Sequence, residues 1–327
     1  MVVMSPSTVE AMQESTADPG LFGPGSITWR IHGDPSMLVA GYRALLLQAV
    51  HPLAMAGFDD NSLFRKDPWK RLLRTGEWIS TVTYGTTTDA EKAGARLRRL
   101  HARLSPGVEP ETGRTYKVDD PELLLWVHCT EVDSFLTTYR RCGGRLRRGE
   151  GDRYVDEMRV SARLVGLDPA AVPASEVEIA DYYASIRPML MVTEVARRNV
   201  VWGFTPPMPL WVRLATPARP AWIGLMSLAA AMLPRWARRL YGLPGLPTTD
   251  LGADLNGRAL RATMSLLPYV GRNSGPPGRA RASSRPRARD RLTQCPSRAG
   301  FTGSGRVPTD RAASPARSRT PRRCDPR

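Results

Sequence analysis

Four helix-start motifs, each followed by apolar residues at helical spacing, constrain the fold of this chain more than any other feature. A carboxylate or hydroxyl before a helix accepts a hydrogen bond from an unpaired amide of the first turn, and proline is tolerated as the first helical residue. The four motifs are the cap-plus-proline pairs Asp34-Pro35 and Asp120-Pro121, and the capping boxes Thr88 to Glu91 and Ser175 to Glu178. Their recurrence predicts a chain built mainly from helices.

Other segments agree with a mostly helical chain. Residues 152–165 and 257–267 also have helical periodicity, and the best strand-like candidate is the short stretch "STVTYGT", residues 80–86. Residues 205–220 contain five prolines and are expected to form a bend or loop. We therefore predict an all-α fold, a bundle of about eight to ten helices given usual helix lengths.

The positive charge of the chain is concentrated at its C-terminal end. Of the formal net charge of +16, residues 272–327 carry 15 arginines against three aspartates, or +12, which leaves +4 for the rest. This tail is rich in Arg, Pro, Ser, Gly and Ala and cannot bury enough apolar surface to fold. We predict a flexible N-terminus (1–20), a helical domain (21–272) and a disordered tail (273–327).

The composition of the tail leaves two interpretations open. It is either a segment that contacts RNA or anionic lipid without sequence specificity, or an extension that carries no function. Composition favours the second, so nucleic-acid contact is expected only through the tail, if at all.

Cysteine usage and the N-terminus indicate a reduced, cytoplasmic setting. The four cysteines form no CxxC pair, which argues against a zinc site and a disulfide framework. The first 20 residues lack a basic stretch followed by an apolar run, so no signal peptide is expected.

The longest apolar stretch, "AWIGLMSLAAAML", covers residues 221–233 and is flanked by arginines. Its thirteen residues fall short of the roughly 20 that are needed to cross a bilayer. A buried helix is the favoured interpretation, and a helix lying on a membrane surface is the alternative. Peripheral membrane contact therefore remains an expectation for this protein.

The segment "RLRRLHARL", residues 96–104, contains one of only four histidines. Its helix is expected to bury one apolar stripe, with His101 and Arg98 at the border of that stripe. The predicted stripe consists of Ala93, Leu97, Leu100 and Leu104. By itself this pattern favours a structural or surface histidine, and a buried stripe is unsuited to a nucleic-acid-binding helix.

The remaining histidines lie at or near apolar segments. His128 shares a helix face with leucines and a phenylalanine, and His51 follows an apolar run and precedes Pro52. His51 is either a site residue or a cap of its own helix C-terminus, whereas His32 has the weakest claim. Histidines on core faces of a bundle can ligate a metal or a haem. No HExxH or ExxH motif accompanies them, so a zinc-protease or di-iron site lacks its carboxylates.

The order of several motifs resembles one known family. The motifs are "GPGSITWRIHGDP", "RALLLQAVHPLAMAGFDDNSLFRKDPWKRLLRT", "VTYGT", "RLHARLSPG" and "LLLWVHCTEVDSF". In this order and spacing they resemble the family of the ER-bound oxygenase MpaB and the catalytic domain of rubber oxygenase, the latex-clearing protein. The resemblance covers residues 22–272.

The resemblance implies an all-helical, globin-like fold that holds haem b. Characterised members use molecular oxygen to cleave carbon–carbon double bonds in isoprenoid chains. The latex-clearing protein has an arginine, then a lysine-threonine pair, then an Arg-x-x-His whose histidine is the proximal iron ligand. Carried over by position, His101 becomes the proximal ligand and the metal-binding residue. Arg71, Arg74 and Thr75 become the lining on the distal side.

These residue types suit that chemistry. A neutral imidazole binds iron through one ring nitrogen, and its other nitrogen needs a hydrogen-bond partner. Arg98, one turn before His101, is placed to pair with a haem propionate. Arg74 and Thr75 can donate hydrogen bonds that stabilise developing negative charge. Without the resemblance, Arg71 and Arg74 would be assigned to a solvated charged face.

Further candidate site residues, and two departures from the family pattern, keep alternatives open. His128 and His51 are additional cofactor-binding candidates, and Asp59 or Asp60 is either a base or an ordinary turn residue, with the turn favoured. Arg74 stands where rubber-cleaving enzymes have lysine. Asn61 stands where many relatives have histidine.

The sequence thus favours a haem-b-dependent oxygenase that acts on a hydrophobic, isoprenoid or lipid-like small molecule with molecular oxygen. The first alternative, which the residues at positions 61 and 74 keep open, is a haem- or lipid-binding protein without turnover. The second is nucleic-acid contact through the basic tail.

Overall fold

The structure is a computed structural model that describes residues 18–61 and 67–266 of the 327-residue chain. This part is 70% helical and contains thirteen α-helices, which confirms the all-α class. The number exceeds the predicted eight to ten because three of the helices, α2, α11 and α13, are only six residues long. The expectations for residues 1–17 and for the tail lie outside the described residues.

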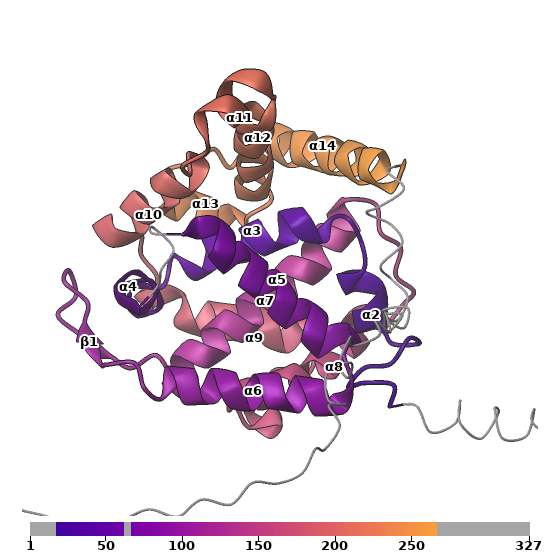
Figure 1. Cartoon of the computed structure of the whole chain (residues 1–327), viewed down its shortest axis with the longest axis vertical. Helices are drawn as coiled ribbons and strands as arrows, with labels where there is room; N and C mark the ends of the chain where they lie inside the picture. Colours follow the sequence, from indigo (N-terminus) through magenta and orange to yellow (C-terminus); the bar gives the residue numbers. More distant parts are fainter. Residues whose placement is uncertain (1–17, 62–66, 267–327) are drawn as a thin grey trace, which may run out of the picture. The chain divides into compact units, whose positions relative to one another are not determined.

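Figure 1 shows the course of the chain. The helices are α2 (Ile27–His32), α3 (Met37–Gln48), α4 (Pro52–Asn61), α5 (Pro68–Tyr84), α6 (Thr87–His101), α7 (Pro121–Arg141), α8 (Glu150–Val165), α9 (Glu176–Ile186), α10 (Glu194–Phe204), α11 (Leu210–Ala215), α12 (Ala218–Ala231), α13 (Arg235–Leu240) and α14 (Pro247–Leu266). Two 3₁₀ turns, η2 (Pro169–Ala171) and η3 (Arg187–Met189), and a hairpin of β1 (Gly107–Val108) and β2 (Thr115–Tyr116) complete the described elements.

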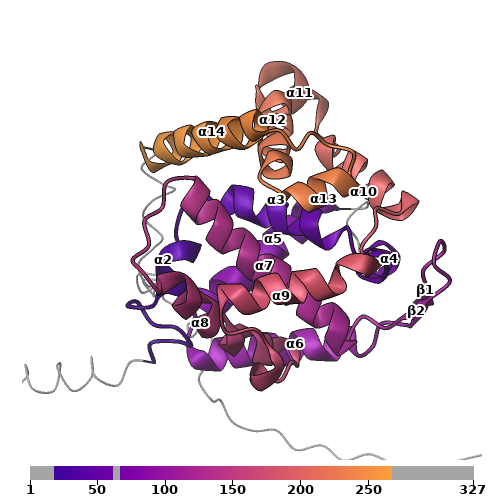
Figure 2. The ribbon, with the colours of Figure 1, turned by 180° about the vertical axis from the view of Figure 1, so that it is seen from behind.

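The 21-residue helix α7 runs through the centre of the helical domain (Figure 1). Helix α3 packs along one side of it, and α8 and α9 pack against it on the side seen from behind in Figure 2. The main core is formed by apolar side chains of these helices and of α12 and α13, among them the fully buried Trp126. Residues far apart in the sequence thus share one core.

Two of the four predicted helix starts are confirmed. Asp120 accepts a hydrogen bond from the Glu122 amide and caps α7, with Pro121 as its first residue. Ser175 accepts from the Glu178 amide and caps α9.

The other two helix starts are shifted. Thr86 rather than Thr88 caps α6, since its hydroxyl accepts a hydrogen bond from the Asp89 amide. Helix α3 begins at Met37, because Asp34 uses its carboxylate to accept from Ser36 and to pair with Arg261 of α14.

The prediction of a strand at "STVTYGT" is wrong, because residues 80–84 form the last turns of α5. Asp67 caps this helix and Pro68 begins it, so the helix is started locally. Val82 and Thr83 are buried at its other end, and their packing outweighs the weak helix propensity of β-branched residues.

Helix α6 packs through small residues rather than through the predicted leucine stripe. Its buried residues are Ala90 and Gly94, whereas Leu100 is 54% exposed. A Cβ added at Gly94 would lie 2.9 Å from the carbonyl oxygen of Leu164 on α8. Of the predicted stripe, Ala93, Leu97 and Leu104 are therefore only partly buried and Leu100 is exposed, because the close contact with α8 is made by the small residues.

The apolar stretch at residues 221–233 forms most of α12, and the predicted burial holds for part of it. Its C-terminal half is buried through Met226, Ala229 and Ala230, whereas Ile223 near its start is exposed. Within the described ranges, no helix is by itself long and apolar enough to cross a membrane. Only α3 and α4, bent by 108° where they meet, pass that test of length and composition as a pair.

We predict opposite effects of alanine at two mid-helix glycines. Gly94→Ala lowers the free energy of unfolding by about 1–3 kcal/mol, because the Leu164 carbonyl cannot move aside. Gly224→Ala on α12, where nothing lies within 4 Å of the added Cβ, raises it by about 0.5–1 kcal/mol. Urea unfolding of both variants measures the difference, and equal effects would contradict the close α6–α8 contact.

Candidate active site

His101 is the last residue of α6, and its ring nitrogen Nδ1 is buried without a hydrogen-bond partner in the described part of the chain. Burial lowers the pKa of His101, Asp119 opposes this shift, and the charge of Arg71 adds to it. The imidazole is therefore neutral at pH 7, the form that ligates metals. One oxygen of Asp119, Oδ1, is likewise buried and unpaired.

Arg71 on α5 is brought into electrostatic range of His101. Helices α5 and α6 pack against each other, which places these two residues near one another. The guanidinium of Arg71 lies over the ring of Phe58 from α4, 4.7 Å from its centre. Although the residue keeps an exposed part, burial of the guanidinium lowers the pKa of Arg71.

The other predicted residues on these two helices have different surroundings. Arg74 and Thr75 are exposed, and the Thr75 hydroxyl donates to the Arg71 carbonyl one turn earlier, at 3.1 Å. Arg98 donates from Nη1 to the carbonyl of Leu164 at 2.7 Å and thereby ties α6 to α8. A propionate contact would have to use the other donors of Arg98.

His128 is buried on α7 as predicted, and burial lowers its pKa to about 4. Glu131 follows it on the same helix face, one turn further on, and was not singled out from the sequence. Burial raises the pKa of Glu131 to about 7, and its charge acts on Tyr154 of α8. A carboxylate inside the apolar run "LLLWVHCTEV" was the signal that sequence reasoning could have used.

His51 lies buried in the turn between α3 and α4 and does not cap its own helix end. Its Nδ1 accepts a hydrogen bond from the Ala54 amide at 3.3 Å, so it caps the following helix instead. Burial lowers its pKa to about 4, so the imidazolium that a C-terminal cap would favour does not form at neutral pH. No hydrogen bond or ring contact among the described residues joins His51 or His128 to His101.

His32 is the most firmly held histidine. One ring nitrogen lies 2.8 Å from the Thr83 hydroxyl and the other 3.1 Å from the Tyr154 hydroxyl, and the ring packs edge-on against Phe135. Burial lowers its pKa to about 3. Since both nitrogens are engaged, His32 has a structural role.

Asp59 and Asp60 are helical residues of α4, so the favoured turn assignment is wrong. Asp59 pairs with Arg198 at 3.0 Å and accepts from the Asn199 amide at 2.8 Å. Asp60 accepts a hydrogen bond from the Tyr116 hydroxyl of β2. These partners join α4 to α10 and to the hairpin.

The haem that the family resemblance implies needs fewer protein ligands than a metal held by protein alone. In residues 18–61 and 67–266, no three His, Cys, Asp or Glu side chains converge in a way that could hold a metal ion. A haem iron needs only an axial side chain from the protein, because the porphyrin itself supplies the remaining iron ligands. The neutral His101 ring, with its buried and unpaired Nδ1 and with Arg71 in electrostatic range, fits that need.

The all-α domain thus brings His101, whose Nδ1 atom is buried and unpaired among the described residues, into electrostatic range of Arg71. The family model described as "ER-bound oxygenase mpaB/B'/Rubber oxygenase, catalytic domain" matches residues 29–267, which is more than half of the chain. The chain therefore belongs to this family. No curated protein and no solved structure shows significant similarity to it.

We predict that Glu131 makes stability fall with rising pH. Its pKa in the folded protein is above that of an ordinary glutamate. The stability that it contributes to the folded state is therefore complete below about pH 4.5 and is lost as the pH rises through about 7. Glu131→Gln should therefore raise the free energy of unfolding at pH 8, relative to its effect at pH 4.5, by about 2–3 kcal/mol.

Urea unfolding at the two pH values measures this difference. Glu122→Gln, in the exposed first turn of the same helix, is the matched control and should show no such gain. A pH-independent effect of Glu131→Gln would contradict the desolvated carboxyl.

Proposed function

We propose that this protein is a haem-b-dependent oxygenase that acts on a hydrophobic, isoprenoid or lipid-like small molecule. Its family membership supports an oxygenase domain, which takes molecular oxygen and a small-molecule substrate. The observation that carries the haem assignment is the neutral His101 ring with its unpaired Nδ1.

His101 would hold the haem iron through Nε2, which would leave Nδ1 to a hydrogen-bond partner. Asp119 is the candidate for that partner, since its charge raises the pKa of His101 and it has an unpaired buried oxygen of its own. An acceptor on the second nitrogen orients the ring and strengthens it as a ligand. When bound, haem b supplies an iron centre that activates molecular oxygen.

Arg71 is the proposed positively charged group of the site. Its partly desolvated guanidinium, held over Phe58, interacts with developing negative charge more strongly than a solvated one. Arg74 and Thr75 are proposed to line the distal side with it. The Thr75 hydroxyl would have to turn from the Arg71 carbonyl to donate to a ligand.

Haem or lipid binding without turnover is the second candidate. The exposure of Arg74 and Thr75 favours it, because hydrogen-bond donors in contact with water lose much of their effect on a reaction. Oxygen consumption with isoprenoid substrates separates the two candidates. Nucleic-acid contact by the tail concerns residues outside those described and stays a prediction.

We predict that the full-length protein mixed with haem b gives a strong Soret absorption band that His101→Ala abolishes or shifts. Imidazole added to this variant should restore the band, because it replaces the missing ligand in the space left by the side chain. His32→Gln is the control, since both nitrogens of His32 are already engaged. Circular dichroism verifies the fold of each variant.

An unchanged spectrum of a folded His101→Ala variant would contradict the ligand assignment. His128 and His51 would then be replaced in turn. If neither changed the spectrum, the haem-dependent function would be abandoned.

We also propose peripheral membrane contact, through which a hydrophobic substrate would be collected. Helices α11, α12 and α14 pack together and expose large apolar side chains. These are Leu210 and Trp211 on α11, Ile223 on α12, and Leu251, Leu255 and Leu266 on α14. Exposed arginines at positions 213 and 219 provide charges that attract anionic headgroups.

We predict that Trp211→Glu weakens binding to vesicles that contain phosphatidylserine, because it removes an amphipathic ring and adds a repelled charge. Val177→Glu on α9 is the matched control, since both side chains are 69% exposed. Both variants keep the basic tail, so vesicle co-sedimentation isolates the effect of the position. Equal binding of the two variants would exclude α11 as the contact.

A further inference from the structure

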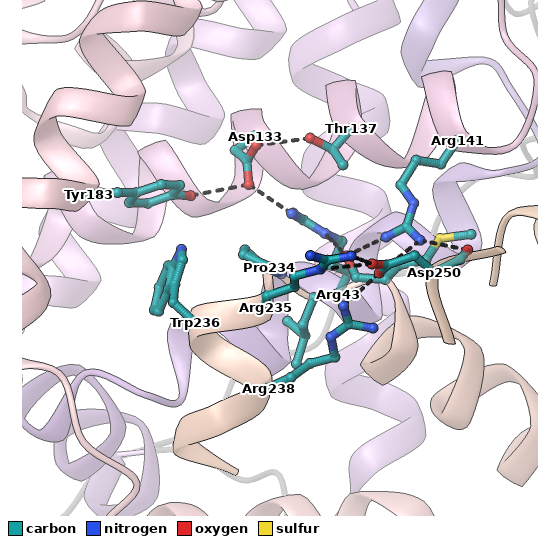
Figure 3. A pocket seen from close by; sticks show the side chains of 12 residues that line it. Arg43, Asp133, Thr137, Arg141, Tyr183, Pro234, Arg235, Trp236, Arg238 and Asp250 are labelled. Atoms are coloured by element: carbon teal, nitrogen blue, oxygen red, sulfur yellow. Dashed lines mark hydrogen bonds and ion pairs between the residues drawn. The ribbon is translucent and has the colours of Figure 1, made fainter. Parts of the chain in front are cut away.

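A pocket of about 360 Å³ lies away from the candidate active site and receives no residue from α5 or α6. Its lining comes from α3, α7, α9, α13, α14 and the segment that joins α12 to α13 (Figure 3). Small-molecule sites in proteins usually have volumes of about 300–1,000 Å³. The pocket is therefore large enough for a small ligand.

Positive charge prevails on the lining. Four arginines line the pocket, at positions 43, 141, 235 and 238, against the carboxylates of Asp133 and Asp250. Asp254, which pairs with Arg141 at 2.6 Å, offsets one further charge. Four positive charges less three negative charges leave an excess of one, which favours an anion.

The excess charge is located around Asp250. Its carboxylate accepts from Arg238 and Arg235 at 2.5 and 3.0 Å, and the Arg141 guanidinium lies 3.7 Å away. Burial alone would raise the pKa of Asp250, but these arginines outweigh it and lower the pKa. Arg43, by contrast, is matched by Asp133 at 2.9 Å.

Arg238 has an unused donor. The residue is 1% exposed, and its two terminal nitrogens donate to Asp250 and to the Ala231 carbonyl. Its Nε–H has no acceptor in the described part of the protein. A buried donor without a partner is unfavourable, because its hydration is lost with nothing in exchange. An anionic ligand in the pocket would supply the acceptor.

The other side of the pocket is aromatic. Figure 3 shows Tyr183 and Trp236 on one side of the pocket and the arginines around Asp250 on the other. The two rings pack against each other with centres 5.8 Å apart. The guanidinium of Arg187 covers the Trp236 ring at 5.2 Å. One end of the pocket is thus suited to charge and the other to an apolar group.

We propose that this pocket binds a small amphipathic anion, with its carboxylate or phosphate group at Arg238 and Arg235 and its apolar part against Tyr183 and Trp236. The site is separate from the proposed haem site and stands independently of it. It would give the protein a second ligand besides its oxygenase substrate.

Isothermal titration calorimetry of the full-length protein with hexyl phosphate, hexanoate and inorganic phosphate tests the proposal. We expect one site that binds hexyl phosphate more tightly than inorganic phosphate, because only the former has an apolar part. Arg238→Lys keeps the charge but removes the Nε–H, and should weaken this binding at least about tenfold. Arg235→Gln, at the exposed rim, should also weaken it and decides the test if Arg238→Lys does not fold.

Arg140→Gln is the control, since Arg140 lies next to Arg141 on α7 but pairs with Glu176 outside the pocket. It should leave the affinity unchanged. Three outcomes would overturn the proposal: no binding of hexyl phosphate or hexanoate, equal affinity of the wild type and both pocket variants, or hexyl phosphate binding no more tightly than inorganic phosphate. Equal affinity of the wild type and both pocket variants for hexyl phosphate would mean that the ligand binds to other arginines of this basic chain.

Discussion

The buried guanidinium of Arg43 is the constraint on which the arrangement of the core depends. It is 2% exposed, and it donates to Ser134 at 2.6 Å and to the Met232 carbonyl at 3.0 Å while it pairs with Asp133. A charge removed from water is tolerated only when it is paired and hydrogen-bonded. These partners belong to α7 and to the end of α12, so satisfying one side chain of α3 holds three helices in register. The proposed anion pocket is built on this cluster.

The candidate active site lies on helices that are held far less firmly. Helix α5 buries only Pro68, Val82 and Thr83, and α6 only Ala90 and Gly94. Segments with few buried apolar contacts open more readily than a core helix such as α7. This difference suits a site that must admit a cofactor and a hydrophobic substrate.

Sequence reasoning found part of this site and missed part of it. The resemblance assigned His101 and Arg71 to one site, and the structure brings the two residues into electrostatic range. It did not identify Glu131, because the raised pKa of that carboxyl depends on enclosure by distant helices rather than on neighbours in the sequence. The Arg238 pocket was also not predicted, since its charges come from four helices that are separate in the sequence.

Local chemistry in the sequence by itself determined the helical class and several helix boundaries. Asp120 and Ser175 cap their helices as predicted, because a cap needs only an acceptor within the first turn. Tertiary structure decided which faces are buried. The turns at residues 80–84 remain helical because Val82 and Thr83 pack into the core, and α6 packs through Gly94 because α8 approaches so closely. Both outcomes depend on contacts between residues far apart in the chain, and periodicity along one helix cannot specify those contacts.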